Sequence, residues 1–263
     1  MDRPVRSPMR PEIEQLPGWM LVAGSALAFA AAYVLTTAIH ELAHALAAAV
    51  FGLHPVWHGD TTPHLTGTAA QETLVALAGP VYSIVSGTAI LALSSRARGY
   101  PGLLLTWLGL LSVAGFFGYL LSGPFATRGD IADALRLQHA PPWVGWLGFV
   151  AGLVGLLSLA RVAAVRLAAL APSDWSAGRA LWYTGLGAVL IAVPLLVAGG
   201  IPVGPPLIAQ LVIMTLTVLL SRMFQAQARP GARAAPPGLI VAAWVFVVLG
   251  LVEWLVLRPG IRL

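Results

Sequence analysis

The sequence predicts an all-α, polytopic membrane protein, and three observations support this fold class. Apolar residues make up 58% of the chain and charged residues only 10%, which lies outside the range of soluble globular domains. The apolar residues gather into seven stretches, each long enough to cross a bilayer core of about 30 Å as a helix. Short segments rich in arginine, glycine or proline separate these stretches. We therefore expect about seven transmembrane helices that form a single domain in the lipid bilayer.

The first three predicted helices lie at residues 18–51, 73–95 and 102–122. Residues 1–17 precede them as an N-terminal tail, and the arginine-containing segment 96–99 separates the second helix from the third. No connection in the chain exceeds about 20 residues, so a separate soluble domain such as a PDZ module has no room.

Four further helices are predicted at residues 143–160, 180–200, 203–221 and 238–257. Two consecutive prolines precede the first of these helices. A stretch rich in glycine and proline, residues 199–206, splits one long uncharged run into two spans. The whole chain is thus expected to be one membrane domain without a soluble module.

The arginines indicate how the chain crosses the membrane. Every basic residue is an arginine, and the arginines lie mostly between apolar runs, which is typical of topology signals and not of a nucleic-acid-binding surface. If the N-terminus lies inside, the cytoplasmic arginines are Arg3, Arg6, Arg10, Arg96, Arg98, Arg161, Arg166, Arg179, Arg222, Arg229 and Arg233. Only Arg128, Arg136, Arg258 and Arg262 then lie outside.

A His-Glu-Leu-Ala-His motif at residues 40–44 lies inside the first predicted helix. Ionisable side chains in a spanning helix cost about 2.5 to 3.5 kcal/mol each, so such a cluster indicates function. His40 and His44 are one helical turn apart and about 40° apart around the axis, so both imidazoles can reach one metal ion. Glu41 lies about 100° from His40, which suits a general base better than a third ligand. Two hydrogen-bonded core histidines are the alternative, which the intervening glutamate disfavours.

The chain has no cysteine, so any metal must be bound by His, Asp or Glu side chains. Asp130 follows the third predicted helix, and the first and third helices run in the same direction. Asp130 and the histidine motif should therefore lie at the same side of the membrane.

Three segments together resemble the site-2 protease family of intramembrane zinc metalloproteases, in particular its short bacterial members that lack a PDZ domain. They are HELAH at 40–44, LVALAGPVYSIVSG at 74–87 and TRGDIADALRL at 127–137. The resemblance implies a three-helix metalloprotease core in residues 18–142, with additional transmembrane helices in residues 143–263. It also implies a multi-pass protein of the cell membrane, in bacteria the inner or plasma membrane.

The resemblance further implies zinc bound by His40, His44 and Asp130, with Glu41 as the general base. The substrate would be a transmembrane protein or peptide that is cleaved within or next to the bilayer. Asp133 is an alternative third ligand, because the segment lacks the Leu-Asp-Gly form of other members.

The resemblance also implies that Gly79, Pro80 and Ser83 contact the substrate. Ser83 occupies the position at which the family often has asparagine. Pro80 should also kink its helix. The segment 61–68 could offer a strand edge to an extended substrate, as a membrane-embedded sheet does in the family.

Further polar residues leave alternatives open. The connection after the first helix contains residues that could complete a metal site, His54, His58, Asp60 and His64. Glu72 and Glu253 are interpreted as helix-end groups that reach the membrane interface. Two other functions remain possible, a zinc-binding membrane protein without proteolytic activity and a small-molecule or ion transporter.

Overall fold

Seven helices in the described part of the chain are long and apolar enough to cross a membrane, which confirms the predicted fold class. The structure is a computed structural model that describes residues 17–198, 201, 205–230 and 238–263. The first four spans are the helices α1 (Gly18–Val50), α2 (Ala69–Ser94), α3 (Gly99–Ser122) and α5 (Pro142–Ala169).

The other three spans are composite helices. One joins α6 (Ala177–Leu181), the π-helix η1 (Trp182–Leu186) and α7 (Gly187–Ala198). The next joins α8 (Pro205–Ser221) to the 3-10 helix η2 (Arg222–Gln227). The last joins α9 (Leu239–Val252) to the π-helix η3 (Glu253–Leu257).

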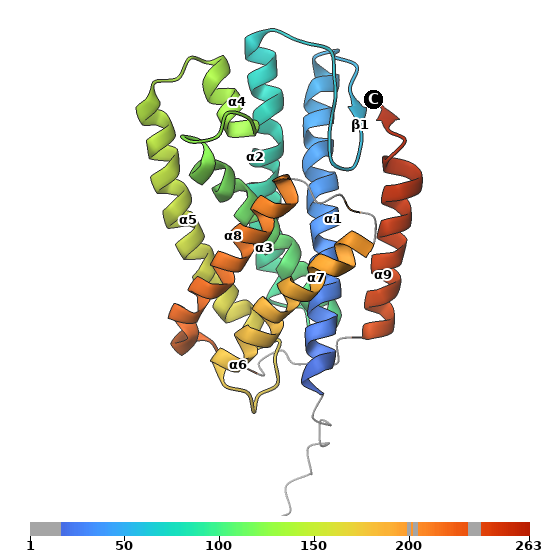
Figure 1. Cartoon of the computed structure of the whole chain (residues 1–263), viewed down its shortest axis with the longest axis vertical. Coiled ribbons are helices and arrows are strands. Elements are labelled where there is room, and N and C mark those ends of the chain that lie inside the picture. The colour runs from blue at the N-terminus through green and yellow to red at the C-terminus, as the bar shows by residue number, and fades with distance from the viewer. Residues whose placement is uncertain (1–16, 199–200, 202–204, 231–237) are drawn as a thin grey trace, which may run out of the picture.

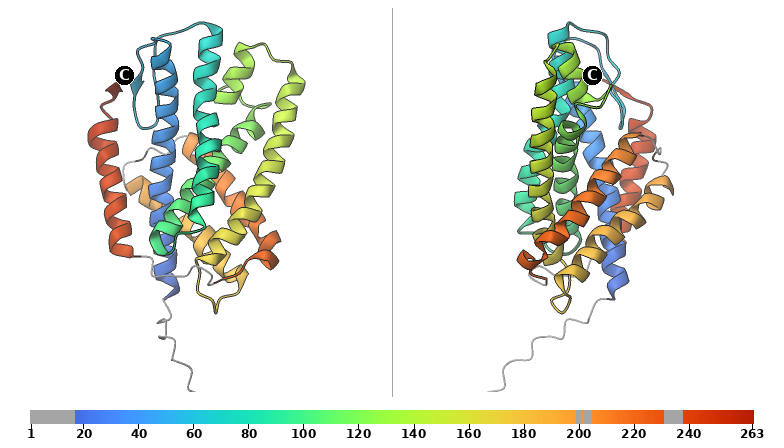
Figure 2. Two further views of the ribbon diagram at one scale, coloured as in Figure 1. Left: turned by 180° about the vertical axis from the view of Figure 1, so that it is seen from behind. Right: turned by 60° about the vertical axis from the view of Figure 1, so that its left-hand side comes forward.

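Helices α1, α2 and α3 pack against one another, and the later helices cover two sides of this group (Figures 1 and 2). Helix α5 packs on α3 and α8, while α7 and α9 pack on α1. The connection between α1 and α2, the short helix α4 (Asp130–Leu137) and the C-terminus all lie at one end of the bundle (Figure 1). We call this the site end; the α5–α6 connection lies at the opposite end.

The core forms around an alanine-rich face of α1, where small side chains let neighbouring helices approach closely. Phe29 and Trp107 are fully buried there and meet edge to face, with ring centroids 5.0 Å apart. Trp107 donates a hydrogen bond to Ser25 Oγ (2.8 Å), and Ser25 donates one to the Thr184 carbonyl (2.6 Å). These bonds tie α1 to α3 and to η1 and satisfy polar groups that would be costly if left unpaired in the membrane.

Several helix boundaries differ from the prediction by three or more residues, and one helix was not predicted. Helix α2 begins before residue 73 because Thr68 and Gln71 form a capping box that extends the helix into polar sequence. Helix α5 continues past residue 160 to Ala169. Helix α4 was missed because it is short and amphipathic, and lies outside the apolar stretches.

The connection between α1 and α2 folds back along the end of the bundle (Figure 1). Its strand β1 (Val56–Trp57) pairs in antiparallel fashion with β2 (Ile261–Arg262) near the C-terminus. The amide of Val56 also donates to the Pro63 carbonyl, and that of His58 donates to the Thr61 carbonyl, both at 2.9 Å. Segment 61–68 itself contains no strand, and its residues 61–63 are joined to residues 56–58 by these two bonds. The edge that it could offer to a substrate stays a prediction.

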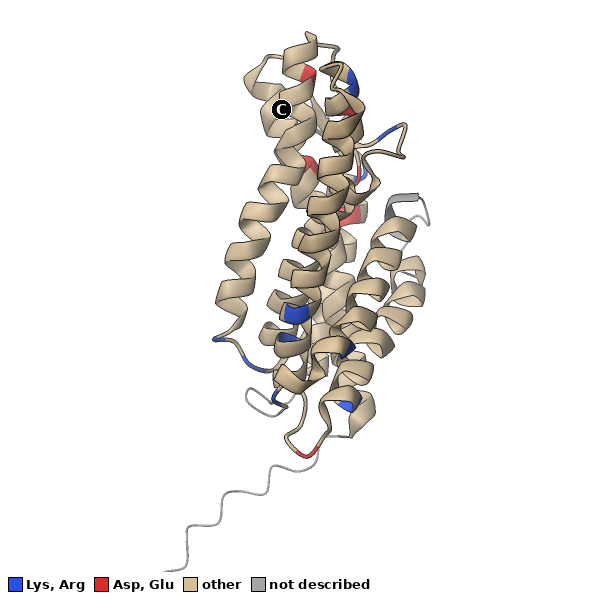
Figure 3. Cartoon of the chain, turned by 90° about the vertical axis from the view of Figure 1, so that its left-hand side faces the viewer, with Lys and Arg blue, Asp and Glu red and all other residues tan. Residues whose placement is uncertain are grey.

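Some predictions concern residues outside the described part of the chain. These are Arg3, Arg6, Arg10, Arg233 and the N-terminal tail up to residue 16, together with most of the glycine- and proline-rich break between the fifth and sixth spans. The described arginines lie mainly toward the two ends of the bundle, as Figure 3 shows.

Candidate metal centre

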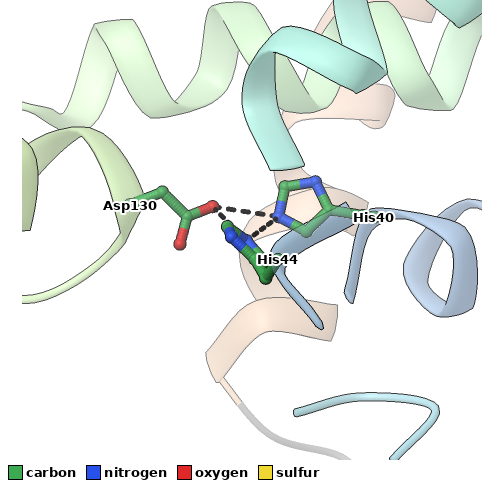
Figure 4. Close-up of side chains that lie close together, drawn as sticks. All are labelled: His40, His44 and Asp130. Atoms are coloured by element: carbon green, nitrogen blue, oxygen red, sulfur yellow. Dashed lines mark hydrogen bonds and ion pairs between the residues drawn. The ribbon is translucent and has the colours of Figure 1, made fainter. Parts of the chain in front are cut away.

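Three potential metal ligands converge at the site end of the bundle (Figure 4). His40 Nε2 lies 2.9 Å from Asp130 Oδ2 and 3.1 Å from His44 Nε2, and His44 Nε2 lies 3.4 Å from Asp130 Oδ2. Ligands about 2.0 to 2.1 Å from a tetrahedral zinc ion would be about 3.3 Å apart. The spacing of the three atoms is therefore close to that of three ligands of one metal ion.

The two histidines are buried side chains of α1 and occupy successive turns, as their spacing predicted. Their rings meet edge to face with centroids 4.8 Å apart, and the Tyr119 ring of α3 stacks on His40 at 5.7 Å. The chain thus holds both imidazoles largely buried, each at the wall of a cavity.

Helix α2 orients both imidazoles through their other nitrogens. His44 Nδ1 donates a hydrogen bond to the Val75 carbonyl at 2.6 Å, and His40 Nδ1 lies 3.0 Å from Ser83 Oγ. A carbonyl can only accept, so the proton of neutral His44 is on Nδ1 and the lone pair on Nε2 faces the site. Such outer hydrogen bonds are typical of histidines that bind metal ions.

Asp130 reaches the histidines from the first residue of α4, just after Gly129. Gly129 has φ +116°, a backbone conformation that favours glycine, directly before the helix that begins with Asp130. Burial raises the pKa of the Asp130 carboxyl, but the adjacent imidazoles outweigh burial and hold this pKa well below its usual value. The group is therefore an ionised carboxylate at neutral pH, as a metal ligand must be.

Asp133 occupies a different environment on the same helix. Its Oδ2 accepts a hydrogen bond from the Gly129 amide at 3.2 Å, and its Oδ1 accepts one from Arg136 at 2.7 Å. Of the two aspartates that the sequence left open, the structure brings only Asp130 to the histidines.

Glu41 lies where two cavities approach each other. One cavity, of about 270 Å³, lies within the bundle and is lined by residues of α1, α2, α3, α8, η3 and the α1–α2 connection, including His40, Tyr119 and Glu253. The other, of about 450 Å³, lies at the site end and is lined by His44, Asp130 and residues of the α1–α2 connection and α4. Glu41 lines both, so its carboxylate faces space beside the three potential ligands.

The residues predicted to contact substrate lie on α2 against the histidines. Ser83 and Gly79 are buried, and a Cβ added to Gly79 would overlap His44 Nε2 and come within 2.6 Å of His40 Nε2. Pro80 is also buried within α2. The structure thus shows Gly79 and Ser83 against the two histidines of the candidate metal centre, while their role toward substrate remains a prediction.

The loop histidines do not join the three-residue group in the described part of the chain. His54 is exposed, and His58 Nδ1 lies 3.2 Å from the Arg258 carbonyl. His64 instead pairs with Glu72, with 3.0 Å between Nε2 and Oε2.

The two glutamates interpreted as helix-end groups have different surroundings. Glu72 lies in the first turn of α2, where its Oε1 accepts a hydrogen bond from the Gly67 amide at 2.6 Å. Glu253 lines the bundle cavity together with Asp60, and its Oε2 is buried without a hydrogen-bond partner among the described residues.

Sequence reasoning missed several residues of the site. Thr62 contacts Glu41, Tyr119 stacks on His40, and the Val75 carbonyl binds His44. Backbone groups and loop hydroxyls carry no spacing signal, since their contacts depend on how α2 and the connection pack against α1. The sequence offered one signal of the local fold, which is Gly129 directly before the predicted ligand Asp130, since a glycine often marks a turn.

Comparisons were made with protein-family models, with curated proteins and with solved structures. None of the three gave a match to this chain.

Proposed function

We propose that this protein is an intramembrane zinc endopeptidase that hydrolyses peptide bonds of transmembrane proteins within or next to the bilayer. The observation that carries the proposal is the convergence of His40, His44 and Asp130 beside Glu41 in a bundle of apolar helices. Two imidazoles, one carboxylate and one open position are typical of catalytic zinc sites, whereas structural zinc sites have four protein ligands.

Each side chain has a defined task in the proposed reaction. His40, His44 and Asp130 would hold the zinc ion. Bound zinc would lower the pKa of water toward about 7 and polarise the scissile carbonyl. Glu41 would take a proton from the attacking water and pass it to the leaving amine nitrogen. The glutamate is suited to this because it lines both cavities and is not one of the three converging ligands.

The two cavities support separate access for substrate and water. The bundle cavity lies among spanning helices and reaches both His40 and Glu41, which suits a substrate segment that comes from the membrane. The cavity at the site end is lined by charged residues such as Asp133 and Arg136, which suits the entry of water. The substrate helix must unwind locally, because the carbonyl of a helical peptide is already hydrogen-bonded within the helix.

The proposal is tested with purified protein in detergent, using fluorescein-labelled casein and synthetic single-span membrane peptides as probes. We expect Glu41→Gln to keep the zinc content of the wild type and to lose cleavage of the probes. His44→Ala should lose both zinc and cleavage. His139→Asn is the matched control, because His139 is exposed and is not one of the three converging ligands, and it should change neither quantity.

Cleavage by Glu41→Gln at the wild-type rate would refute the role of Glu41. A wild type that binds zinc stoichiometrically but cleaves no probe would favour the non-proteolytic alternative. Solute flux through liposomes that survives Glu41→Gln would favour the transporter.

A further inference from the structure

A chain of hydrogen bonds runs from the start of α2 through the α1–α2 connection to Glu41. Thr62 Oγ1 donates toward two oxygens of Glu41, its carbonyl at 2.9 Å and Oε2 of its side chain at 3.0 Å. The Thr62 carbonyl accepts from His64 Nδ1 at 3.0 Å, and His64 Nε2 lies 3.0 Å from Glu72 Oε2. The other oxygen of Glu72 accepts from the Gly67 amide.

We infer that Thr62 is a positioning residue for Glu41 and that the His64–Glu72 pair anchors it. This inference rests on the proposed function, because it assigns Thr62 to the proton transfer that Glu41 performs. The function itself needs only Glu41 and the three ligands. The inference adds that the reaction also depends on a loop hydroxyl that binds no metal and acts only through the carboxylate.

The contact between Thr62 and Glu41 fixes one oxygen of the carboxylate. A glutamate side chain has three rotatable bonds, and holding it in one arrangement has a cost in conformational entropy. The single hydroxyl proton of Thr62 is shared between Oε2 and the Glu41 carbonyl, so the contact keeps Oε2 beside the backbone of α1 and leaves Oε1 to take a proton. A general base must stay within hydrogen-bond reach of the proton that it removes, so holding the carboxylate in place favours the reaction.

The anchor has the chemistry needed to hold Thr62. The two ring nitrogens of His64 face a carbonyl and a carboxylate, both of which accept hydrogen bonds, so the imidazole joins the Thr62 carbonyl to Glu72. Glu72 in turn belongs to the capped first turn of α2. The bonds from Val56 to Pro63 and from His58 to Thr61 hold the opposite side of the same segment. Thr62 is thus fixed from both sides.

The decisive comparison is Thr62→Val against Thr62→Ser in the zinc-loaded full-length protein, with labelled casein as the probe. Valine keeps the shape of threonine but lacks the hydroxyl, whereas serine keeps the hydroxyl. A hydrogen bond to a charged group contributes about 1.5 to 3 kcal/mol, so we expect kcat to fall about 10- to 100-fold in Thr62→Val. KM and zinc content should stay within about twofold of the wild type, and Thr62→Ser should recover most of kcat.

Two controls separate positioning from a general effect on folding. Thr88→Val removes a hydroxyl that is exposed on α2 and donates to the Ile84 carbonyl of its own helix, and it should leave kcat unchanged. His64→Ala removes the anchor, so it should speed amide hydrogen exchange in residues 60–67 of the metal-free protein. In that background Thr62→Val should lower kcat less than it does in the wild type, because the two residues act through one network.

Wild-type kcat in zinc-loaded Thr62→Val would overturn the inference and leave the proposed function intact. A rise in KM alone would also overturn it, since that result assigns Thr62 to substrate binding. Unchanged hydrogen exchange in His64→Ala would remove the anchor from the inference. If the wild type cleaves no probe, the proposed function fails first and the role of Thr62 in that reaction falls with it.

Discussion

Two aspartates on one short helix show how a single turn separates a potential metal ligand from a structural group. Asp130 stands at the first position of α4, beside the histidines of α1, and its side chain is only 21% exposed. Asp133 lies one turn later and binds the Gly129 amide and Arg136. The ion pair with Arg136 is largely exposed and contributes little to stability, whereas the contacts of Asp130 define the site.

We therefore expect Asp130→Asn and Asp133→Asn to differ in zinc binding. Asn keeps the size of Asp but removes the negative charge, so Asp130→Asn should lower zinc affinity by roughly 10-fold or more. Asp133→Asn should keep zinc affinity within about threefold, because its carboxylate does not face the histidines. Metal analysis of both purified variants beside the wild type measures this difference. Equal losses in the two variants would contradict the assignment of Asp130.

The residues that could be predicted from sequence are those whose contacts follow from helical spacing. His40 and His44 face the same direction because they are four residues apart in one helix. Ser83 could be singled out but not placed, since its contact with His40 depends on the packing of α2 against α1. Thr62 could not be found at all, because its contact with Glu41 requires the fold of a whole connection.

At the scale of elements, the apolar stretches predict where helices span but not where they begin. The polar capping box at Thr68 starts α2, and a short amphipathic helix carries Asp130. Both features lie in polar sequence, so a search for apolar stretches does not find them. The pairing of β1 with β2 joins segments about 200 residues apart, so no local pattern could predict it.

At the candidate metal centre, Gly79 lets α2 approach α1 closely because it has no side chain. A Cβ at Gly79 would overlap the imidazole nitrogens that converge on Asp130. We expect Gly79→Ala to push the rings apart or the helices away from each other, and so to lower zinc affinity by roughly 10-fold or more. Zinc titration of purified protein measures the change.

Gly250→Ala is the matched control for that substitution. Gly250 lies in α9, also inside an apolar helix, and a Cβ there meets nothing within 4 Å. This variant should bind zinc as the wild type does. If Gly79→Ala also bound zinc with wild-type affinity, the close packing of α2 would not be needed to hold the imidazoles.

At the scale of the whole molecule, the uneven distribution of arginines predicts the orientation in the membrane. Among the described residues, the connections and helix ends opposite the site end carry Arg96, Arg98, Arg161, Arg166, Arg179, Arg222 and Arg229. The site end carries Arg128, Arg136, Arg258 and Arg262. Because cytoplasmic connections are enriched in basic residues, the metal centre should lie near the outer face of the membrane.

The absence of cysteine from the chain makes this orientation directly measurable. Thr66 is exposed in the connection at the site end, and Asp174 is exposed in the α5–α6 connection at the opposite end. A membrane-impermeant maleimide added to intact cells should label Thr66→Cys, but it should label Asp174→Cys only after the cells are permeabilised. The reverse pattern would place the metal centre at the cytoplasmic face, where substrate and water would reach the two cavities from the other side of the membrane. The arginine distribution would then not determine the orientation of this protein.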